Sequence, residues 1–91
     1  MILKSVELTV KGLVQGVGFR YYVRDEAKQL GISGWVKNLS NGDVLILAQG
    51  EESGIDEFIE KIKSGNSFAR IEEVEVKEAG EEMLNDFQIK Y

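Results

Sequence analysis

GLVQGVGFR, residues 12–20, joins a strand-like segment of the chain to a helix-like one. Before it, apolar and polar side chains alternate over residues 2–11, which is the period of a half-buried strand. After it, Val23, Ala27 and Leu30 recur at helical spacing and predict a helix from about Arg20 to Leu30. The stretch therefore turns the chain from a strand into a helix.

The glycines of this stretch predict an anion-binding loop. Gly12, Gly16 and Gly18 let the backbone turn so that successive N–H groups point inward. Such a nest before a helix N-terminus attracts anions through its amides and through the helix dipole. Arg20 stands at the helix start, where its planar guanidinium can meet two phosphate oxygens at once. Spacing alone leaves an alternative open, in which the stretch is only a turn and Arg20 is a solvated cation.

The rest of the chain predicts a strand pair, a second helix and two more strands. We expect these elements at Ile32–Leu39, Asp43–Gln49, Gly54–Lys63, Ile71–Glu78 and Phe87–Tyr91. Asn41-Gly42 predicts a hairpin turn between the paired strands. Asp43–Gln49 is apolar on both faces and is therefore expected inside the sheet. Ser53 is the expected N-cap of the second helix.

This order, βαββαβ with a short final strand, predicts an α+β fold of the ferredoxin-like type. We expect an antiparallel sheet of four strands plus the short C-terminal strand, with two helices on one face. Residues 1–91 are expected to form a single domain, because no linker or low-complexity run interrupts the pattern. The aromatic side chains of Trp35, Phe58 and Phe87 are expected in the core, and Tyr21 and Tyr22 are expected to pack.

Composition limits the chemistry that the chain can perform. It has no cysteine and no histidine, so thiolate chemistry is absent and a metal site would lack its commonest ligands. Any catalysis must therefore use carboxylates, amides, hydroxyls, amines or guanidinium groups. The net charge of −5 divides into +2 over residues 1–50 and −7 over residues 51–91. A small anion site fits the first half, whereas the broad basic face of a nucleic-acid binder is missing.

The ends and the hydropathy of the chain predict its surroundings. The first ten residues lack the long apolar run of a signal peptide. No stretch approaches the roughly 20 apolar residues that a membrane-spanning helix needs. We expect a soluble cytoplasmic protein, most simply a monomer, with no membrane and no nucleic acid as partners.

Taken as a whole string, GLVQGVGFR resembles the phosphate-binding signature of the acylphosphatase family, GxVQGVxxR. The segment Gly34-Trp35-Val36-Lys37-Asn38, followed by Gly42, Val44 and Gly50, is similar to that family's other signature. The resemblance continues through Ser67, Ala69 and Val74 into the terminal FQIKY, so it covers essentially the whole chain. It implies the ferredoxin-like fold and the hydrolysis of acyl phosphates to carboxylate and inorganic phosphate, without metal or cofactor.

The resemblance also implies roles for individual residues. Arg20 would bind the phosphoryl group and stabilise its charge, and Asn38 would position the attacking water. The backbone N–H groups of the loop would complete the cradle; they belong to Gln15, Gly16, Val17, Gly18 and Phe19. Asparagine ahead of a turn often only caps the backbone, and the residues alone leave that alternative open for Asn38.

The implied reaction is chemically reasonable for a chain without histidine. An acyl phosphate already carries a good leaving group, so positioning and electrostatic stabilisation can provide the catalysis. Asn38 can accept a hydrogen bond from water and donate one, but it cannot take the proton. We expect the proton to pass to a phosphate oxygen of the substrate.

Two other function classes compete with the hydrolase. The same fold hosts many functions, so a non-catalytic module that binds phosphate or carbamoyl phosphate is the main alternative. Acylphosphatase-like domains also occur inside larger carbamoyl-phosphate-using maturation proteins, although a free chain of 91 residues favours the enzyme. A nucleic-acid-binding domain would need exposed aromatic side chains on the sheet and a basic surface, and it ranks last.

Overall fold

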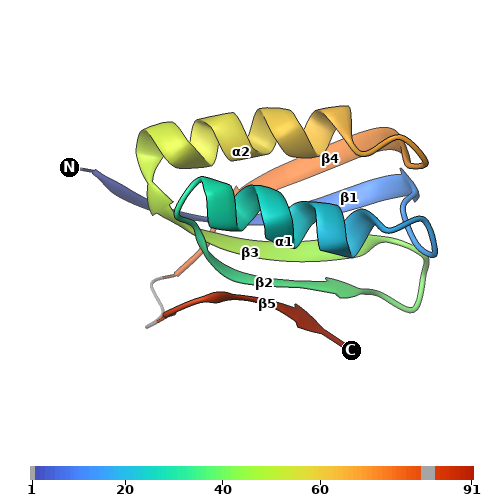
Figure 1. Ribbon diagram of the computed structural model, residues 1–91, viewed down its shortest axis with the longest axis horizontal. Coiled ribbons are helices and arrows are strands. Elements are labelled where there is room, and N and C mark those ends of the chain that lie inside the picture. The colour runs from blue at the N-terminus through green and yellow to red at the C-terminus, as the bar shows by residue number, and fades with distance from the viewer. Residues whose placement is uncertain (1, 81–83) are drawn as a thin grey trace.

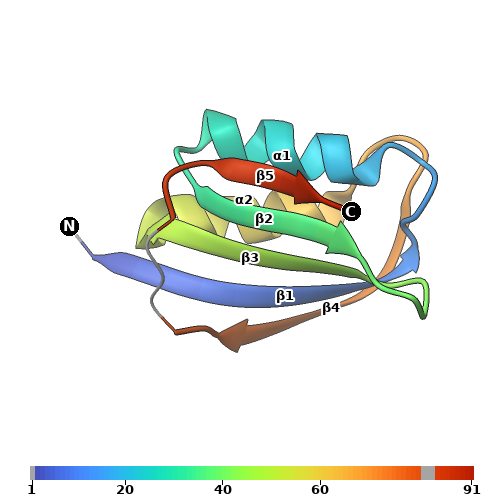
Figure 2. The same cartoon turned by 90° about the horizontal axis from the view of Figure 1, so that it is seen from below.

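The computed structural model describes residues 2–80 and 84–91, and its elements follow the predicted order. They are β1 Leu3–Leu13, α1 Phe19–Gln29, β2 Ser33–Asn38, β3 Val44–Glu51, α2 Glu52–Ser64, β4 Arg70–Glu78 and β5 Phe87–Lys90. Figure 1 shows α1 and α2 side by side on one face of the sheet. Figure 2, turned by 90°, shows the strands from below, with the helices behind them. The predicted ferredoxin-like α+β arrangement is confirmed. Within the described residues, no helix is long and apolar enough to cross a membrane.

The five strands form one sheet in the order β4-β1-β3-β2-β5. β3 lies between β1 and β2, as its two apolar faces predict. Antiparallel pairing joins β1 to β3, β1 to β4 and β2 to β3, whereas β5 pairs with β2 in parallel. The sheet is therefore mixed, and the expectation of antiparallel pairing is wrong for the C-terminal strand.

The direction of β5 follows from where β4 ends. One row of paired residues crosses the whole sheet through Glu78, Val6, Ala48, Gly34 and Phe87. The last residue of β4 and the first residue of β5 therefore lie at the same level, near the end of the sheet where β2 begins. From that end β5 can only run alongside β2 in the same direction.

The core lies between the sheet and the helices. Val6, Leu8 and Val10 of β1 face it, which confirms the alternation expected from the sequence. Each helix adds an apolar stripe, namely Phe19, Val23 and Ala27 from α1 and Ile55, Phe58 and Ile62 from α2. Phe58 and Phe87 meet edge to face with ring centroids 6.2 Å apart, so both are core residues as predicted.

Trp35 and Ser53 differ from their predicted roles. Trp35 is half-buried on the sheet face that points away from the helices, because its neighbours Gly34 and Val36 take the inward positions of β2. Ser53 lies inside α2, whose N-cap is Glu51 without a side-chain cap hydrogen bond. β3 continues to Glu51, and the Glu52 N–H donates to the Ile2 carbonyl at 2.8 Å, so the residue just before β1 replaces the serine cap.

Gly34 occupies a position that has no room for a side chain. A Cβ built there would lie 1.8 Å from the carbonyl oxygen of Leu47, and the φ angle of +149° also disfavours other residues. Gly12 is similar, since its Cβ would meet the carbonyl oxygen of Arg70 at 2.1 Å beside an irregularity in the β1–β4 pairing. These two signature glycines therefore serve the packing of the strands.

We expect Gly34→Ala to destabilise the fold by more than about 3 kcal/mol, because the new methyl group overpacks the β2–β3 contact and strains the backbone. Urea unfolding followed by circular dichroism measures this change. Gly80→Ala is the matched control, because a Cβ at Gly80 meets nothing within 4 Å. A Gly34→Ala protein as stable as the control would contradict the close-approach explanation.

Candidate anion-binding site

The loop between β1 and α1 has the shape that an anion cradle requires. Gly16 and Gly18 adopt φ angles of +74° and +77°, and Gly18 is the N-cap of α1. The flanking side chains of Val14 and Phe19 are buried and hold the two ends of the loop against the core. The sequence prediction of a glycine-shaped turn before a helix agrees with this geometry.

The amides of the loop have no acceptor among the residues that the structure describes. In the part of the chain that the structure describes, no backbone N–H from Gln15 to Arg20 donates a hydrogen bond to a protein atom. The first helical amide with such a partner is that of Tyr22, which donates to the Gly18 carbonyl at 3.1 Å. The first turn of α1 carries no acidic side chain. This N-terminus can therefore donate hydrogen bonds to an anion without an internal competitor.

The side chain of Gln15 ties the loop to the β2–β3 turn. Its Nε2 donates to the carbonyl oxygens of Leu39 at 2.8 Å and Asp43 at 2.9 Å, in a partly buried position. The family resemblance implies only a backbone N–H contribution from Gln15 to anion binding, so the sequence did not predict this role of its side chain. The signature motif was the sole signal for it, because the partners are 24 and 28 residues away.

Arg20 lies in the first turn of α1 and reaches the C-terminal end of the chain. Its Nη1 is 3.4 Å from the carbonyl oxygen of Lys90, and its guanidinium carbon lies 4.9 Å from the ring centre of Tyr91. Arg20 pairs with no carboxylate within 4.0 Å among the described residues. One contact to a neutral carbonyl and one to an aromatic face orient the guanidinium and leave its charge uncompensated.

Asn38 ends β2 on the inward side of the sheet, opposite Val44. Its Oδ1 is buried and has no hydrogen-bond partner in the structure. The turn that follows is closed by other groups: the Leu39 N–H donates to the Asp43 carbonyl, and the Asp43 N–H donates to the Asn41 side chain. The described contacts thus leave no capping bond for the Asn38 oxygen, and Asn41 is the turn residue that the sequence predicted.

Strand pairing brings Arg20 and Asn38 to one end of the molecule. Lys37, the neighbour of Asn38, is the register partner of Lys90, whose carbonyl oxygen contacts Arg20. Gln15 joins the same end through Leu39, the other neighbour of Asn38. In Figure 1 the β1–α1 loop, the β2–β3 turn and the α2–β4 connection all lie at the right-hand end. The residues that the signatures nominated are therefore grouped, although they come from two separate segments.

The α2–β4 connection supplies a contact that the sequence did not indicate. Asn66 Nδ2 donates to the Val17 carbonyl oxygen at 2.8 Å, across 49 residues of sequence. Its Oδ1, like that of Asn38, is buried without a partner. The loop is thus held by side chains from two different parts of the fold.

Of the two tyrosines of α1, Tyr22 packs as predicted, whereas the prediction that Tyr21 packs is wrong. Tyr22 lies against the core, stacks on Phe19 with 6.1 Å between ring centres, and donates its hydroxyl to the Lys61 carbonyl at 2.7 Å. Burial raises the pKa of the Tyr22 phenol, and the nearby Glu26 carboxylate raises it further. Tyr21 is exposed, and the guanidinium of Arg24 lies 5.1 Å from its ring centre.

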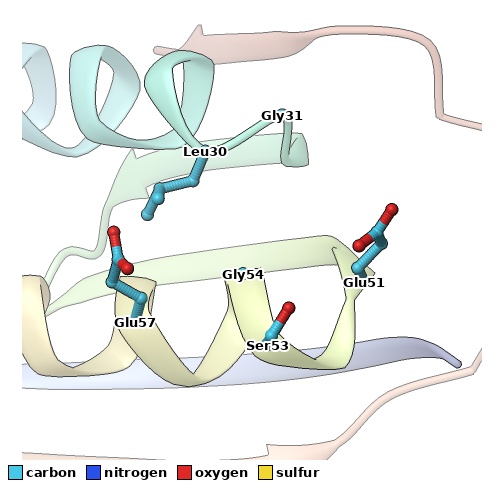
Figure 3. Close-up of a pocket in the computed structure, with 6 residues that line it drawn as sticks. All are labelled: Leu30, Gly31, Glu51, Ser53, Gly54 and Glu57. Carbon is cyan, nitrogen blue, oxygen red and sulfur yellow. The ribbon is translucent and has the colours of Figure 1, made fainter. Parts of the chain in front are cut away.

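Away from this loop, a hollow of about 370 Å³ is lined by residues from the end of α1 and the start of α2 (Figure 3). Figure 3 shows the side chains of Leu30 and Glu57 pointing toward one another, with Glu51 at the far side. The two carboxylates in its lining, together with the absence of a lining cation, make it a poor site for a phosphate. The β1–α1 loop is the better anion site.

The comparisons with known proteins agree with this geometry. The family model described as Acylphosphatase matches residues 6–89. This chain belongs to the acylphosphatase family. A curated acylphosphatase of Oceanobacillus iheyensis is 44% identical over 98% of this chain and 100% of its own length.

Solved structures of the acylphosphatase family have the same fold. The crystal structure of acylphosphatase from Bacillus subtilis superposes with a TM-score of 0.94 at 41% identity, covering 99% of this chain and 100% of that chain. Full-length HypF, solved in a phosphate- and nucleotide-bound form, matches with a TM-score of 0.89 at 31% identity. That match covers 99% of this chain but 12% of HypF, so the same fold also occurs as part of a much longer protein.

We expect Gln15→Ala to lower the free energy of unfolding by about 1 to 3 kcal/mol, because two partly buried side-chain hydrogen bonds are lost, each of which typically contributes about 1 kcal/mol. Gln15→Glu is expected to cost more at neutral pH, since a carboxylate would face both carbonyls. That extra cost should shrink as the pH falls, because this setting raises the pKa of the new carboxyl and its protonated form can donate again. Urea unfolding at several pH values measures both effects.

Gln29→Ala is the matched control for this experiment, since Gln29 is an exposed residue of α1. If Gln15→Ala were no less stable than Gln29→Ala, the side chain of Gln15 would not be holding the two loops together.

Proposed function

We propose that this chain hydrolyses acyl phosphates, with the Gln15–Arg20 loop holding the phosphoryl group and Asn38 orienting the attacking water. One observation carries the proposal. Three groups that find no partner among residues 2–80 and 84–91 lie at the same end of the fold: the amides of a helix N-terminus, the guanidinium of Arg20 with respect to carboxylates, and the buried Oδ1 of Asn38. Membership of the acylphosphatase family supports the reaction class.

The loop and Arg20 suit a phosphoryl group because that group carries dispersed negative charge. Amides that are already oriented need no reorganisation when charge moves onto the equatorial oxygens in the transition state. The guanidinium of Arg20 supplies a full positive charge and two parallel donors. Its contacts to the Lys90 carbonyl and the Tyr91 ring hold it in place without neutralising it.

Asn38 suits the nucleophilic water because its Oδ1 is an acceptor without a protein donor. A water that donates to this oxygen would have its own lone pair free to attack phosphorus. The bond between the water oxygen and phosphorus forms while the bond between phosphorus and the bridging oxygen breaks, and the carboxylate leaves. The water proton passes to a phosphate oxygen, since an amide cannot accept it.

Catalysis would need no metal or cofactor, because the loop amides and Arg20 already provide the charge stabilisation that a cation would give. We also propose that residues 1–91 act as a single-domain, cytoplasmic monomer whose partners are small acyl phosphates rather than nucleic acid. The net charge of −5 is the support for excluding nucleic acid. Light scattering after size-exclusion chromatography tests the monomer.

The alternative is a non-catalytic module that binds phosphate or carbamoyl phosphate. The match to a short part of HypF is the observation that favours it. The two functions differ in turnover, since a module would bind inorganic phosphate at the same loop without hydrolysing an acyl phosphate. Family membership together with full mutual coverage of the curated relative favours the enzyme.

We expect Arg20→Ala and Asn38→Ala each to reduce the rate of benzoyl phosphate hydrolysis about 100- to 1000-fold, the usual cost of removing one transition-state contact. The rate is measured with a metal chelator present, by the release of inorganic phosphate. Arg20→Ala should also weaken inhibition by inorganic phosphate, whereas Asn38→Ala should leave that inhibition nearly unchanged, because it acts on the water.

Arg24→Ala serves as the matched control for Arg20, since Arg24 lies on the same helix and pairs with Asp25 at the surface. Wild-type protein that releases no phosphate while still binding it would favour the module. Full activity in both Arg20→Ala and Asn38→Ala would contradict the catalytic roles proposed for these two residues.

A further inference from the structure

Asn66 holds the anion loop from the side opposite to Gln15. It follows the last turn of α2, where the Gly65 N–H donates to the Lys61 carbonyl, and its own carbonyl accepts from the Ala69 N–H. These backbone bonds fix the connection, and from it the Asn66 side chain donates to the Val17 carbonyl at 2.8 Å. This hydrogen bond is the contact of interest, because Val17 is in the middle of the loop.

The contact determines which way one amide of the loop points. A peptide unit is planar and trans, so the carbonyl of Val17 and the N–H of Gly18 point in opposite directions. With the carbonyl held toward Asn66, the Gly18 N–H must point away from Asn66, and no protein acceptor meets it in the described chain. Asn66 therefore sets the orientation of an amide that the cradle uses.

Without this contact, the peptide has little to prevent its rotation. Gly18 has no side chain and tolerates both signs of φ, and a Cβ placed on it would meet only Asn66 Nδ2, at 3.7 Å. Rotation would replace an inward N–H by the Val17 carbonyl oxygen. That oxygen would repel a phosphoryl group at the place where the N–H would bind it.

The other half of the Asn66 amide has no partner in the described part of the chain that would explain the residue. Its Oδ1 is buried and meets no hydrogen-bond donor among the described residues. Among the described residues, the side-chain atoms in this condition are the amide oxygens of Asn66 and Asn38. Unpaired buried polar atoms call for a functional explanation, and both of these lie at the loop end of the fold.

We propose that Asn66 is a positioning residue for phosphoryl binding, acting through the Val17–Gly18 peptide rather than by touching the substrate. The inference rests on the proposed function, since it gives the loop amides the same role. It adds a residue from the α2–β4 connection to the segments that form the site. The substrate class is unchanged: the group recognised is the phosphate of an acyl phosphate.

The test compares Asn66→Ala with Ser67→Ala, a control that changes the exposed neighbour. Three quantities are measured far below the melting temperature: kcat and KM for benzoyl phosphate and the inhibition constant of inorganic phosphate. The melting temperature of each variant is measured separately by thermal unfolding. We expect kcat/KM to fall about 10- to 100-fold in Asn66→Ala, in line with the sensitivity of catalysis to misplacement. The inhibition constant should rise about tenfold, with no matching loss of melting temperature.

Nuclear magnetic resonance separates positioning from a purely structural role. Titration of the ¹⁵N-labelled wild type with inorganic phosphate should shift the amide signals of the Gln15–Arg20 loop, Gly18 included. In Asn66→Ala the Gly18 shift should shrink most. Asn66→Asp should have the larger effect, because the new carboxylate repels the Val17 carbonyl and accepts from the rotated Gly18 N–H.

Two outcomes would overturn the inference while leaving the proposed function intact. The first is an Asn66→Ala protein with kcat/KM and phosphate inhibition within about twofold of Ser67→Ala. The second is a loss of activity fully accounted for by a lower melting temperature, with the Gly18 shift unchanged. A wild type that neither turns over benzoyl phosphate nor shows phosphate-induced shifts would instead overturn the proposed function, and this inference with it.

Discussion

An anion cradle made of backbone amides cannot be held together by those same amides. Each N–H that donates within the protein is lost to the ligand, so the loop between β1 and α1 must be fixed by other groups. The structure uses buried apolar side chains at its ends, Val14 and Phe19, and hydrogen bonds from two amide side chains. Gln15 joins the loop to the β2–β3 turn, and Asn66 joins it to the α2–β4 connection. The rest of the site depends on this separation, in which side chains fix the loop and leave its backbone amides for the ligand.

The sheet topology then decides which residues can meet the cradle. β3 is the central strand, between β1 and β2, and the connections at the loop end are those that leave β1, β2 and α2. The parallel pairing of β5 with β2 brings Lys90 level with Lys37, one residue before Asn38. An antiparallel β5 would run toward the other end of the sheet and carry the chain terminus away from Arg20. The direction of a four-residue strand thus determines the surroundings of the arginine.

Much of this architecture could be predicted because it leaves a periodic trace in the sequence. The alternation in β1, the helical stripes of α1 and α2, and the two apolar faces of β3 each follow from local burial. The direction of β5 and the outward face of Trp35 left no such trace, since both depend on where distant strands lie. The side-chain roles of Gln15 and Asn66 were likewise hidden, because their partners are 24 to 49 residues away. The signatures indicated Arg20 and Asn38, and both lie at the same end of the structure. Their roles in catalysis stay predictions.

The buried oxygens of Asn38 and Asn66 show where the demands of stability and of the site diverge. Neither meets a donor among the described residues, and a buried acceptor that stays unpaired typically costs about 1 to 3 kcal/mol in a fold whose total stability is about 5 to 15 kcal/mol. An apolar residue of similar size would avoid that cost at position 38, whereas at position 66 it would also remove the donor to the Val17 carbonyl. For Asn38, the free oxygen is the feature that a nucleophilic water would need. For Asn66, the useful atom is the nitrogen, and the unpaired oxygen accompanies it because an amide carries both. The same cost therefore has two different origins, one in the chemistry and one in the geometry of the loop.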